Sequence, residues 1–237
     1  ESARLVDPVA DHRLLGIRRG GEPGQWGRLL DTELEPWLAD HRLGADAVLP
    51  AAAMLEMALA AMRCRAPEAA ALELAEFRIL RALTLEEGRT RELRCTLDGE
   101  GAFRLESRRR LAEECWTLHA LGEARAATAA ALASPPALAP GGAATEGEAV
   151  RRCARGRGRG SGPAVAALAR HVQPAAAPPD AGFLQHPARL DAALQGLFGL
   201  LMDSPPPPGT GLVPVKVGRL VARPSGAPAV TAEITLT

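Results

Sequence analysis

The chain contains no tyrosine, and only 3% of its 237 residues are aromatic. It has no surplus of either charge, because 28 basic residues balance 28 acidic ones. A balanced charge gives no general reason to bind nucleic acid or a membrane surface, and we expect neither partner. No stretch approaches 18 uninterrupted apolar residues, so we expect no transmembrane helix. The first residues lack the apolar core of a signal peptide, which predicts a cytoplasmic protein.

Cysteine is scarce, with four residues at positions 64, 95, 115 and 153 and no CxxC pair among them. Zinc sites and disulfide frameworks usually show closely spaced or patterned cysteines. We therefore expect free thiols in a reducing compartment and no bound metal.

Two stretches are apolar on nearly every face and predict buried helices. The first begins at Pro50 and runs to about Arg63, with Glu56 as its only charge before Arg63. The second covers 187–202 and carries Asp191 and Gln195, which share one face at a spacing of i, i+4. A buried carboxyl group is costly unless it is paired, neutral or useful, so Asp191 is the first functional candidate.

Short alternating runs predict antiparallel strands around these helices. Residues 71–122 hold several such runs separated by glycine turns, and residues 14–17 and 25–30 predict a hairpin. Two further strands are expected at 212–223 and 228–237. A helix followed by strands occurs twice, which predicts an α+β protein with two similar halves and a groove where they meet.

Two segments between the halves are low in complexity. Residues 124–147 are rich in alanine, proline and glycine, which predicts a linker. Residues 151–163 alternate arginine with glycine but contain no aromatic residues to stack on bases and no GK[ST] signature of a phosphate loop. We interpret this basic segment as a solvated loop.

Several motifs resemble those of dehydratase domains from modular polyketide synthases. The stretch from His41 to Pro50 has the spacing of the family's HxxxGxxxxP motif, and the stretch from His186 to Gln195 matches HPxxLDxxxQ in full. Residues 12–18, 116–123 and 212–220 resemble three further family segments, in the same order along the chain.

The resemblance implies a double hotdog, in which two antiparallel sheets each wrap around a central helix. It divides the chain into an N-terminal hotdog at 1–123, a linker at 124–147 and a C-terminal hotdog at 148–237. It also implies a hydro-lyase that dehydrates a β-hydroxyacyl thioester during polyketide biosynthesis. The substrate would be carried on the phosphopantetheine of an acyl carrier protein, with no bound cofactor. The expected partners are that carrier protein, neighbouring synthase domains and a second copy of the chain.

By this resemblance His41 and Asp191 face each other across the groove as the catalytic pair. A neutral His41 suits removal of the α-proton, and a carboxyl group can protonate the departing hydroxyl. Burial of Asp191 favours its acid form, whereas the nearby helix N-terminus favours the anion. The sequence does not decide which of these two effects is larger. Gln195 would orient Asp191 or hold water.

Backbone N–H groups after Pro50, at Ala51 and Ala52, would bind the thioester oxygen as negative charge develops on it. The family's GYGPxF stretch corresponds to 160–165, so the resemblance implies substrate-tunnel positions at Gly162, Pro163 and Val165.

The chain departs from the family pattern in three respects. Ala45 occupies the motif glycine's position while Gly44 lies one residue early, and Ser161 and Val165 replace aromatic residues of GYGPxF. A left-handed conformation at Ala45 would be strained. The spacing from 165 to 186 is also shorter than we expect. These departures leave two alternatives open: a non-catalytic scaffold domain, or a double-bond isomerase or cyclase that uses the same pair.

Overall fold

The computed structural model describes residues 9–20, 24–127, 164–169, 182–188, 190–191, 194, 214–223 and 231–236. The elements of the first half are β1 (Ile17–Arg18), β2 (Gln25–Leu30), the 3₁₀ helix η1 (Pro36–Asp40), β3 (Arg42–Leu43), β4 (Asp46–Val48), α1 (Ala51–Arg65), β5 (Leu72–Ile79), β6 (Thr84–Leu85), β7 (Arg91–Leu97), β8 (Ala102–Arg109) and β9 (Thr117–Ala126). Those of the second half are β10 (Ala164–Ala169), β11 (Lys216–Ala222) and β12 (Thr231–Leu236).

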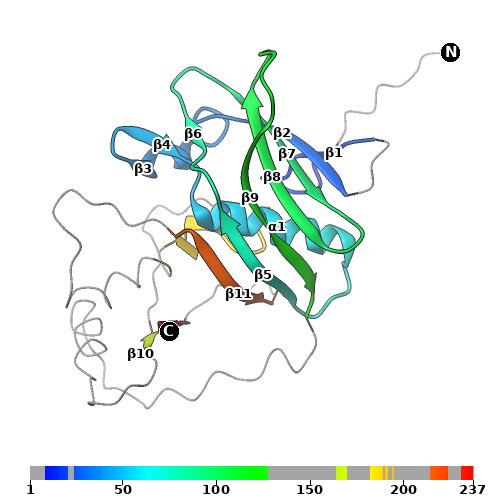
Figure 1. Cartoon of the computed structure of the whole chain (residues 1–237), viewed down its shortest axis with the longest axis vertical. Helices are drawn as coiled ribbons and strands as arrows, with labels where there is room; N and C mark the ends of the chain where they lie inside the picture. Colours follow the sequence, from blue (N-terminus) through cyan, green and yellow to red (C-terminus); the bar gives the residue numbers. More distant parts are fainter. Residues whose placement is uncertain are drawn as a thin grey trace.

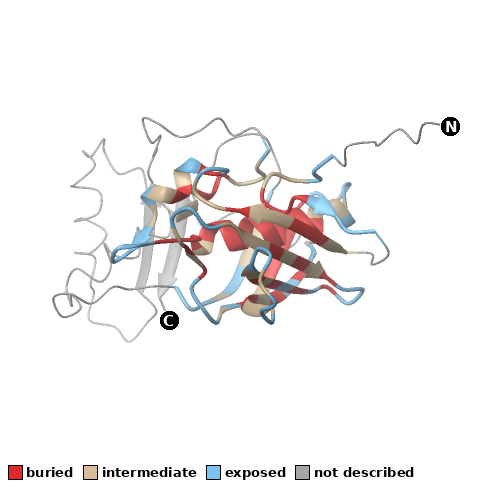
Figure 2. Cartoon of the chain, turned by 90° about the horizontal axis from the view of Figure 1, so that it is seen from above, coloured by how far each residue is buried: buried red, intermediate tan, exposed pale blue. Residues whose placement is uncertain are grey.

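Helix α1 is the centre of the first half, as the sequence predicted. Pro50 lies at the N-cap, and every residue from 52 to 62 is buried, including Glu56. A helix without a polar face needs cover on all sides, and the sheet provides most of it. Figure 1 shows the strands curving around α1, and Figure 2 shows buried residues concentrated on the helix and the strands that face it.

A seven-stranded antiparallel sheet forms this cover, in the order β1-β2-β7-β8-β9-β5-β11. Alternate residues of β7 and β8 point inward, so that Leu93, Cys95, Phe103 and Leu105 are buried while Arg94 and Arg104 are not. The predicted hairpin is confirmed as β1 and β2, although its first strand covers Ile17–Arg18 and not 14–17. The meander is confirmed for β7, β8 and β9, whereas β5 lies beyond β9 in the sheet. Strand β6 leaves the meander and joins β3 and β4 in a separate three-stranded sheet.

Strand β11 comes from the second half but lies in the first half's sheet. It pairs antiparallel with β5, with Val217 opposite Phe77 and Ala222 opposite Leu72. The other second-half strands, β10 and β12, pair with each other. Strand β10 covers a stretch in which the sequence predicted no strand.

The described residues between 187 and 194 are helical, in agreement with the predicted second helix. Of its described residues, Pro187 is buried, and Leu190, Asp191 and Leu194 are half-buried. Leu190 and Leu194 pack against the first half's core, so one side of the helix is covered. The rest of this helix lies outside the described residues.

Strand β9 continues to Ala126, three residues past the boundary expected at 123. Most of the predicted linker and the whole basic segment at 151–163 lie outside the described residues. Within the described ranges, Cys64, Cys95 and Cys115 are free thiols, and no cluster of three or more histidine, cysteine or acidic side chains could hold a metal ion. No helix in these ranges is long and apolar enough to span a membrane.

Candidate active site

The structure brings His41 and Asp191 together from opposite halves of the chain. His41 Nε2 lies 3.7 Å from Asp191 Oδ1, and the two side chains are 34% and 19% exposed. The distance is longer than a direct hydrogen bond, but it places both groups within reach of one small substrate. Partial burial leaves each side chain accessible.

The short 3₁₀ helix η1 and the β3–β4 hairpin position His41. Its backbone N–H donates to Leu38, and its backbone carbonyl accepts from Val48. Its Nδ1 lies 3.1 Å from the Val48 carbonyl oxygen. Because a carbonyl oxygen only accepts, Nδ1 carries the proton of this bond and a neutral ring keeps its lone pair on Nε2. The ring is therefore oriented with its basic nitrogen toward Asp191.

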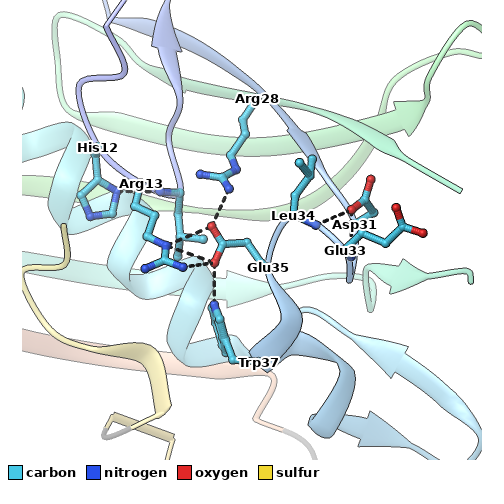
Figure 3. Close-up of polar contacts among 9 residues, drawn as sticks. His12, Arg13, Arg28, Asp31, Glu33, Leu34, Glu35 and Trp37 are labelled. Atoms are coloured by element: carbon cyan, nitrogen blue, oxygen red, sulfur yellow. Dashed lines mark hydrogen bonds and ion pairs between the residues drawn. The ribbon is translucent and has the colours of Figure 1, made fainter. Parts of the chain in front are cut away.

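A buried carboxylate, Glu35, holds the start of η1 in place. Glu35 accepts hydrogen bonds from Arg13, from Arg28 at 2.5 Å and from the indole N–H of Trp37 at 2.7 Å. Figure 3 shows these three donors converging on the two carboxylate oxygens. The turn before it is closed by Asp31, which accepts from the backbone N–H groups of residues 33 and 34. The element that carries His41 thus has a rigid base.

The hairpin after His41 resolves the question raised by Ala45. Gly44 has φ of +65° and Ala45 does not lie in the left-handed region. Strands β3 and β4 flank these two residues as a two-residue loop, and positive φ at only the first position is the pattern of a type II′ turn. Gly44 adopts the positive φ that the turn requires, so Ala45 is not strained in the way that the motif comparison predicted.

Helix α1 begins beside this hairpin with no side-chain cap at Pro50. The carbonyl of Pro50 accepts the N–H groups of Ala53 and Met54. The N–H groups of Ala51 and Ala52 lie in the first turn, ahead of the intrahelical ladder, where backbone donors are available to a ligand. Their assignment to the thioester oxygen stays a prediction.

The remaining predicted site residues are not brought to the pair by the described structure. Gln195, Gly162 and Pro163 lie outside the described residues. Val165 belongs to β10, where its backbone is paired with Thr235. Their roles stay predictions as well.

Sequence reasoning missed the residues that hold the Asp191 segment against the first half. Glu56 accepts the backbone N–H groups of Leu184 and Gln185. The ring of Phe183 contacts Trp37 and His186. The sequence did indicate that Glu56 needs hydrogen-bonding partners, because it is a single charge in an otherwise apolar, buried helix.

Comparisons with known proteins identify the family. A family model described as a polyketide synthase dehydratase domain matches residues 11–111, and one described as a polyketide synthase dehydratase N-terminal domain matches residues 147–237. A phenolphthiocerol/phthiocerol polyketide synthase subunit from Mycobacterium tuberculosis is 32% identical over 227 residues, which cover 86% of this chain and 12% of that protein. The chain thus spans about an eighth of the curated relatives it matches over most of its length.

Solved structures show the same fold. GphF Dehydratase 1 superposes with a TM-score of 0.70 at 24% identity, covering 94% of this chain and 85% of that one. A fusion dehydratase domain has a TM-score of 0.65 at 25% identity, covering 96% and 83%. The fold is therefore the α+β double hotdog that the motifs implied. The chain belongs to the family of polyketide synthase dehydratase domains.

Proposed function

We propose that this domain removes water from a β-hydroxyacyl thioester and yields an α,β-enoyl thioester during polyketide biosynthesis. The observation that supports it most directly is the 3.7 Å approach of His41 Nε2 to Asp191 Oδ1, with the other ring nitrogen occupied by Val48. The α-hydrogen and the β-hydroxyl sit on adjacent carbons of such a substrate. An acid and a base separated by a few ångströms can reach both.

In this mechanism His41 Nε2 takes the α-proton, and the electron pair moves toward the thioester carbonyl. The N–H groups of Ala51 and Ala52 stabilise the developing negative charge. The C–O bond then breaks while Asp191, in its acid form, donates its proton to the hydroxyl, which leaves as water. A proton returning from His41 to the adjacent Asp191 restores both groups, so the reaction consumes no cofactor.

The substrate in this proposal is attached to the phosphopantetheine of an acyl carrier protein, within a cytoplasmic synthase. The mycobacterial relatives are named as parts of a polyketide synthase, and such a setting would supply neighbouring domains and the carrier. A second copy of the chain is a further expected partner.

The test is turnover of β-hydroxyacyl phosphopantetheine thioesters of either β-configuration, followed as the mass loss of one water. We expect His41→Ala and Asp191→Asn each to lower kcat by at least about a hundredfold, the usual contribution of general acid–base catalysis. Asp46→Asn is the matched control, because this exposed aspartate lies on the same hairpin as His41. It should leave kcat unchanged.

Three outcomes would overturn the proposal. A folded wild type without turnover would favour a scaffold domain. Movement of a double bond in an enoyl thioester, or ring closure, without dehydration of the hydroxyacyl substrate would favour an isomerase or cyclase. Full activity in both variants would remove the pair from the mechanism.

A further inference from the structure

Glu56 is a fully buried carboxylate in the middle of α1, and three N–H donors converge on it. His12 Nε2 lies 3.0 Å from Oε1, and the backbone nitrogens of Leu184 and Gln185 lie 2.5 Å from Oε1 and 2.9 Å from Oε2. His12 Nδ1 accepts the N–H of Leu14, so its Nε2 carries a proton to donate. Among the described residues Glu56 thus has three donors around it and no acceptor, which suits a carboxylate that only accepts hydrogen bonds.

The two backbone amides bound by Glu56 immediately precede the turn that carries Asp191. The next residue, His186, accepts the N–H of Ala188 on its side chain at 3.2 Å and the N–H of Leu190 on its carbonyl at 3.1 Å. These bonds begin the helix in which Asp191 follows Leu190. A helical turn is stiff, so a shift at residues 184 and 185 is transmitted to the carboxyl group facing His41.

Aromatic contacts also hold this segment. The Phe183 ring centroid lies 4.8 Å from that of His186 and 6.4 Å from that of Trp37, and the Arg13 guanidinium lies 5.3 Å from it. Trp37 belongs to η1, which leads directly into His41. Ring contacts tolerate sliding, whereas the Glu56 bonds fix the backbone in direction and distance.

We propose that Glu56 is a positioning residue for the catalytic pair. Its carboxylate anchors the backbone at residues 184 and 185 of the second half to the central helix of the first, and this anchor keeps Asp191 opposite His41. The inference rests on the proposed function of that pair.

The test is Glu56→Gln, which keeps the shape but replaces one acceptor oxygen with an NH₂ group facing N–H donors. We expect kcat for dehydration to fall about ten- to a hundredfold with KM changed less than threefold, because misplacement of an acid by about 1 Å can cost that much. Amide exchange of the peptide containing residues 184 and 185 should accelerate at least tenfold.

Glu73→Gln is the matched control. Glu73 is also a buried carboxylate, but Arg125 and Arg219 hold it on the sheet, and neither belongs to the catalytic constellation. This variant should leave kcat and the exchange of that peptide unchanged. If Glu56→Gln does not fold, a second pair of variants tests the same inference. Gln185→Pro removes one bound N–H and should reproduce the loss of kcat, whereas Gln185→Ala keeps that N–H and should not.

A readout without turnover separates this inference from the proposed function. The ring resonances of His41 should move in the same direction in Glu56→Gln as in Asp191→Asn, and this comparison decides the matter even if the wild type proves inactive. Unmoved resonances would overturn the inference, as would unchanged exchange at residues 184 and 185. Accelerated exchange with wild-type kcat in an active enzyme would also overturn it.

Discussion

At the scale of single residues, the hairpin after His41 shows that a motif glycine is required for its backbone conformation. The family motif places glycine at position 45, yet this chain needs positive φ at residue 44 and has glycine there. The side chain of Arg42 donates to the carbonyls of Ala39 and Ala45 and braces the same loop. A one-residue displacement of the glycine is thus absorbed within a two-residue turn.

The first prediction follows from that turn. Apart from its two chain neighbours, no described residue has an atom within 4 Å of a Cβ added at Gly44, so we expect a substitution there to be penalised through the backbone. We expect Gly44→Ala to lower the free energy of unfolding by about 1–2 kcal/mol, because an alanine, unlike glycine, is strained at positive φ. Gly44→Asn should cost less, because asparagine tolerates this conformation. Denaturant unfolding would measure both, and equal losses would contradict the turn assignment.

A second residue-scale prediction concerns His119, a buried residue of β9. Its Nε2 accepts from the Ser107 hydroxyl at 2.8 Å, and its Nδ1–H donates to the Arg81 carbonyl. Burial lowers the pKa of His119 below its ordinary value of 6.5. The unfolded chain therefore binds a proton first as the pH falls below about 6.5, and the folded state loses stability from there until its own lower pKa is passed.

We expect the free energy of unfolding of the wild type to fall between pH 7 and pH 5 more steeply than that of His119→Gln, although the variant is less stable at neutral pH. Carboxyl groups such as Glu92, whose pKa is lowered by Arg108 and Arg19 despite its burial, lose their contribution only below the ordinary pKa of 4.5 and fall outside this window. Urea titrations at several pH values provide the measurement. Parallel curves for the two proteins would refute the assignment.

At the scale of elements, β5 is the strand on which the two halves meet. It pairs with β9 on one side and β11 on the other, and its pairing with β9 shifts register at a bulge between Ala75 and Arg78. Within the bulge, Glu76 has φ of +49° and Phe77 is fully buried. Hydrogen bonds from Arg219 of β11 and Arg125 of β9 lower the pKa of Glu73 on β5. Charge and pairing together fasten the second half's strand to this edge.

The prediction at this scale uses Gly122 of β9, which lies against the bulge. A Cβ at this position would come within 2.8 Å of the Phe77 ring and 2.9 Å of its Cα. We expect Gly122→Ala to lower the free energy of unfolding by about 1–3 kcal/mol, as overpacking of a core does. The double variant Gly122→Ala with Phe77→Leu should lose less than the two single losses combined. Additive losses would show that the two residues do not share this space.

At the scale of the whole molecule, the two halves share one core and one site. Phe183, Leu190 and Leu220 of the second half pack against the first half's buried cluster, and β11 completes its sheet. The pair His41 and Asp191, on which the proposed chemistry depends, takes one side chain from each half. Stability and activity should therefore depend on both halves together.

We predict that the molecule unfolds in one transition. All three tryptophans, at 26, 37 and 116, lie in the first half, so their fluorescence reports on that half, whereas the proposed dehydration uses one side chain from each half. The denaturant midpoints of the two signals should coincide, which is the usual test of two-state behaviour. Loss of turnover at clearly lower denaturant than the fluorescence change would show that the second half unfolds separately.

Local pattern was enough for much of this architecture. Alternation in the 91–109 region identified β7 and β8, and continuous apolar character from residue 52 onward identified α1, because these signals depend only on which side chains must leave water. The stretch containing β10 escaped notice, since its alanine-rich sequence has neither strict alternation nor β-branched residues beyond Val165. Strand pairing, not side-chain pattern, defines it.

The sequence by itself determined the family motifs, the central helix, the strands of the first half and the two residues on which the proposed chemistry depends. The family resemblance implied that His41 and Asp191, 150 positions apart in the chain, face each other, but only the tertiary structure decided which of their atoms approach and that β11 joins the first half's sheet. It also decided which donors satisfy Glu56. The physical reason is that the polarity of neighbouring side chains is enough to indicate which residues are buried. The partners of a buried charge and the register between distant strands depend on the fold of the whole chain.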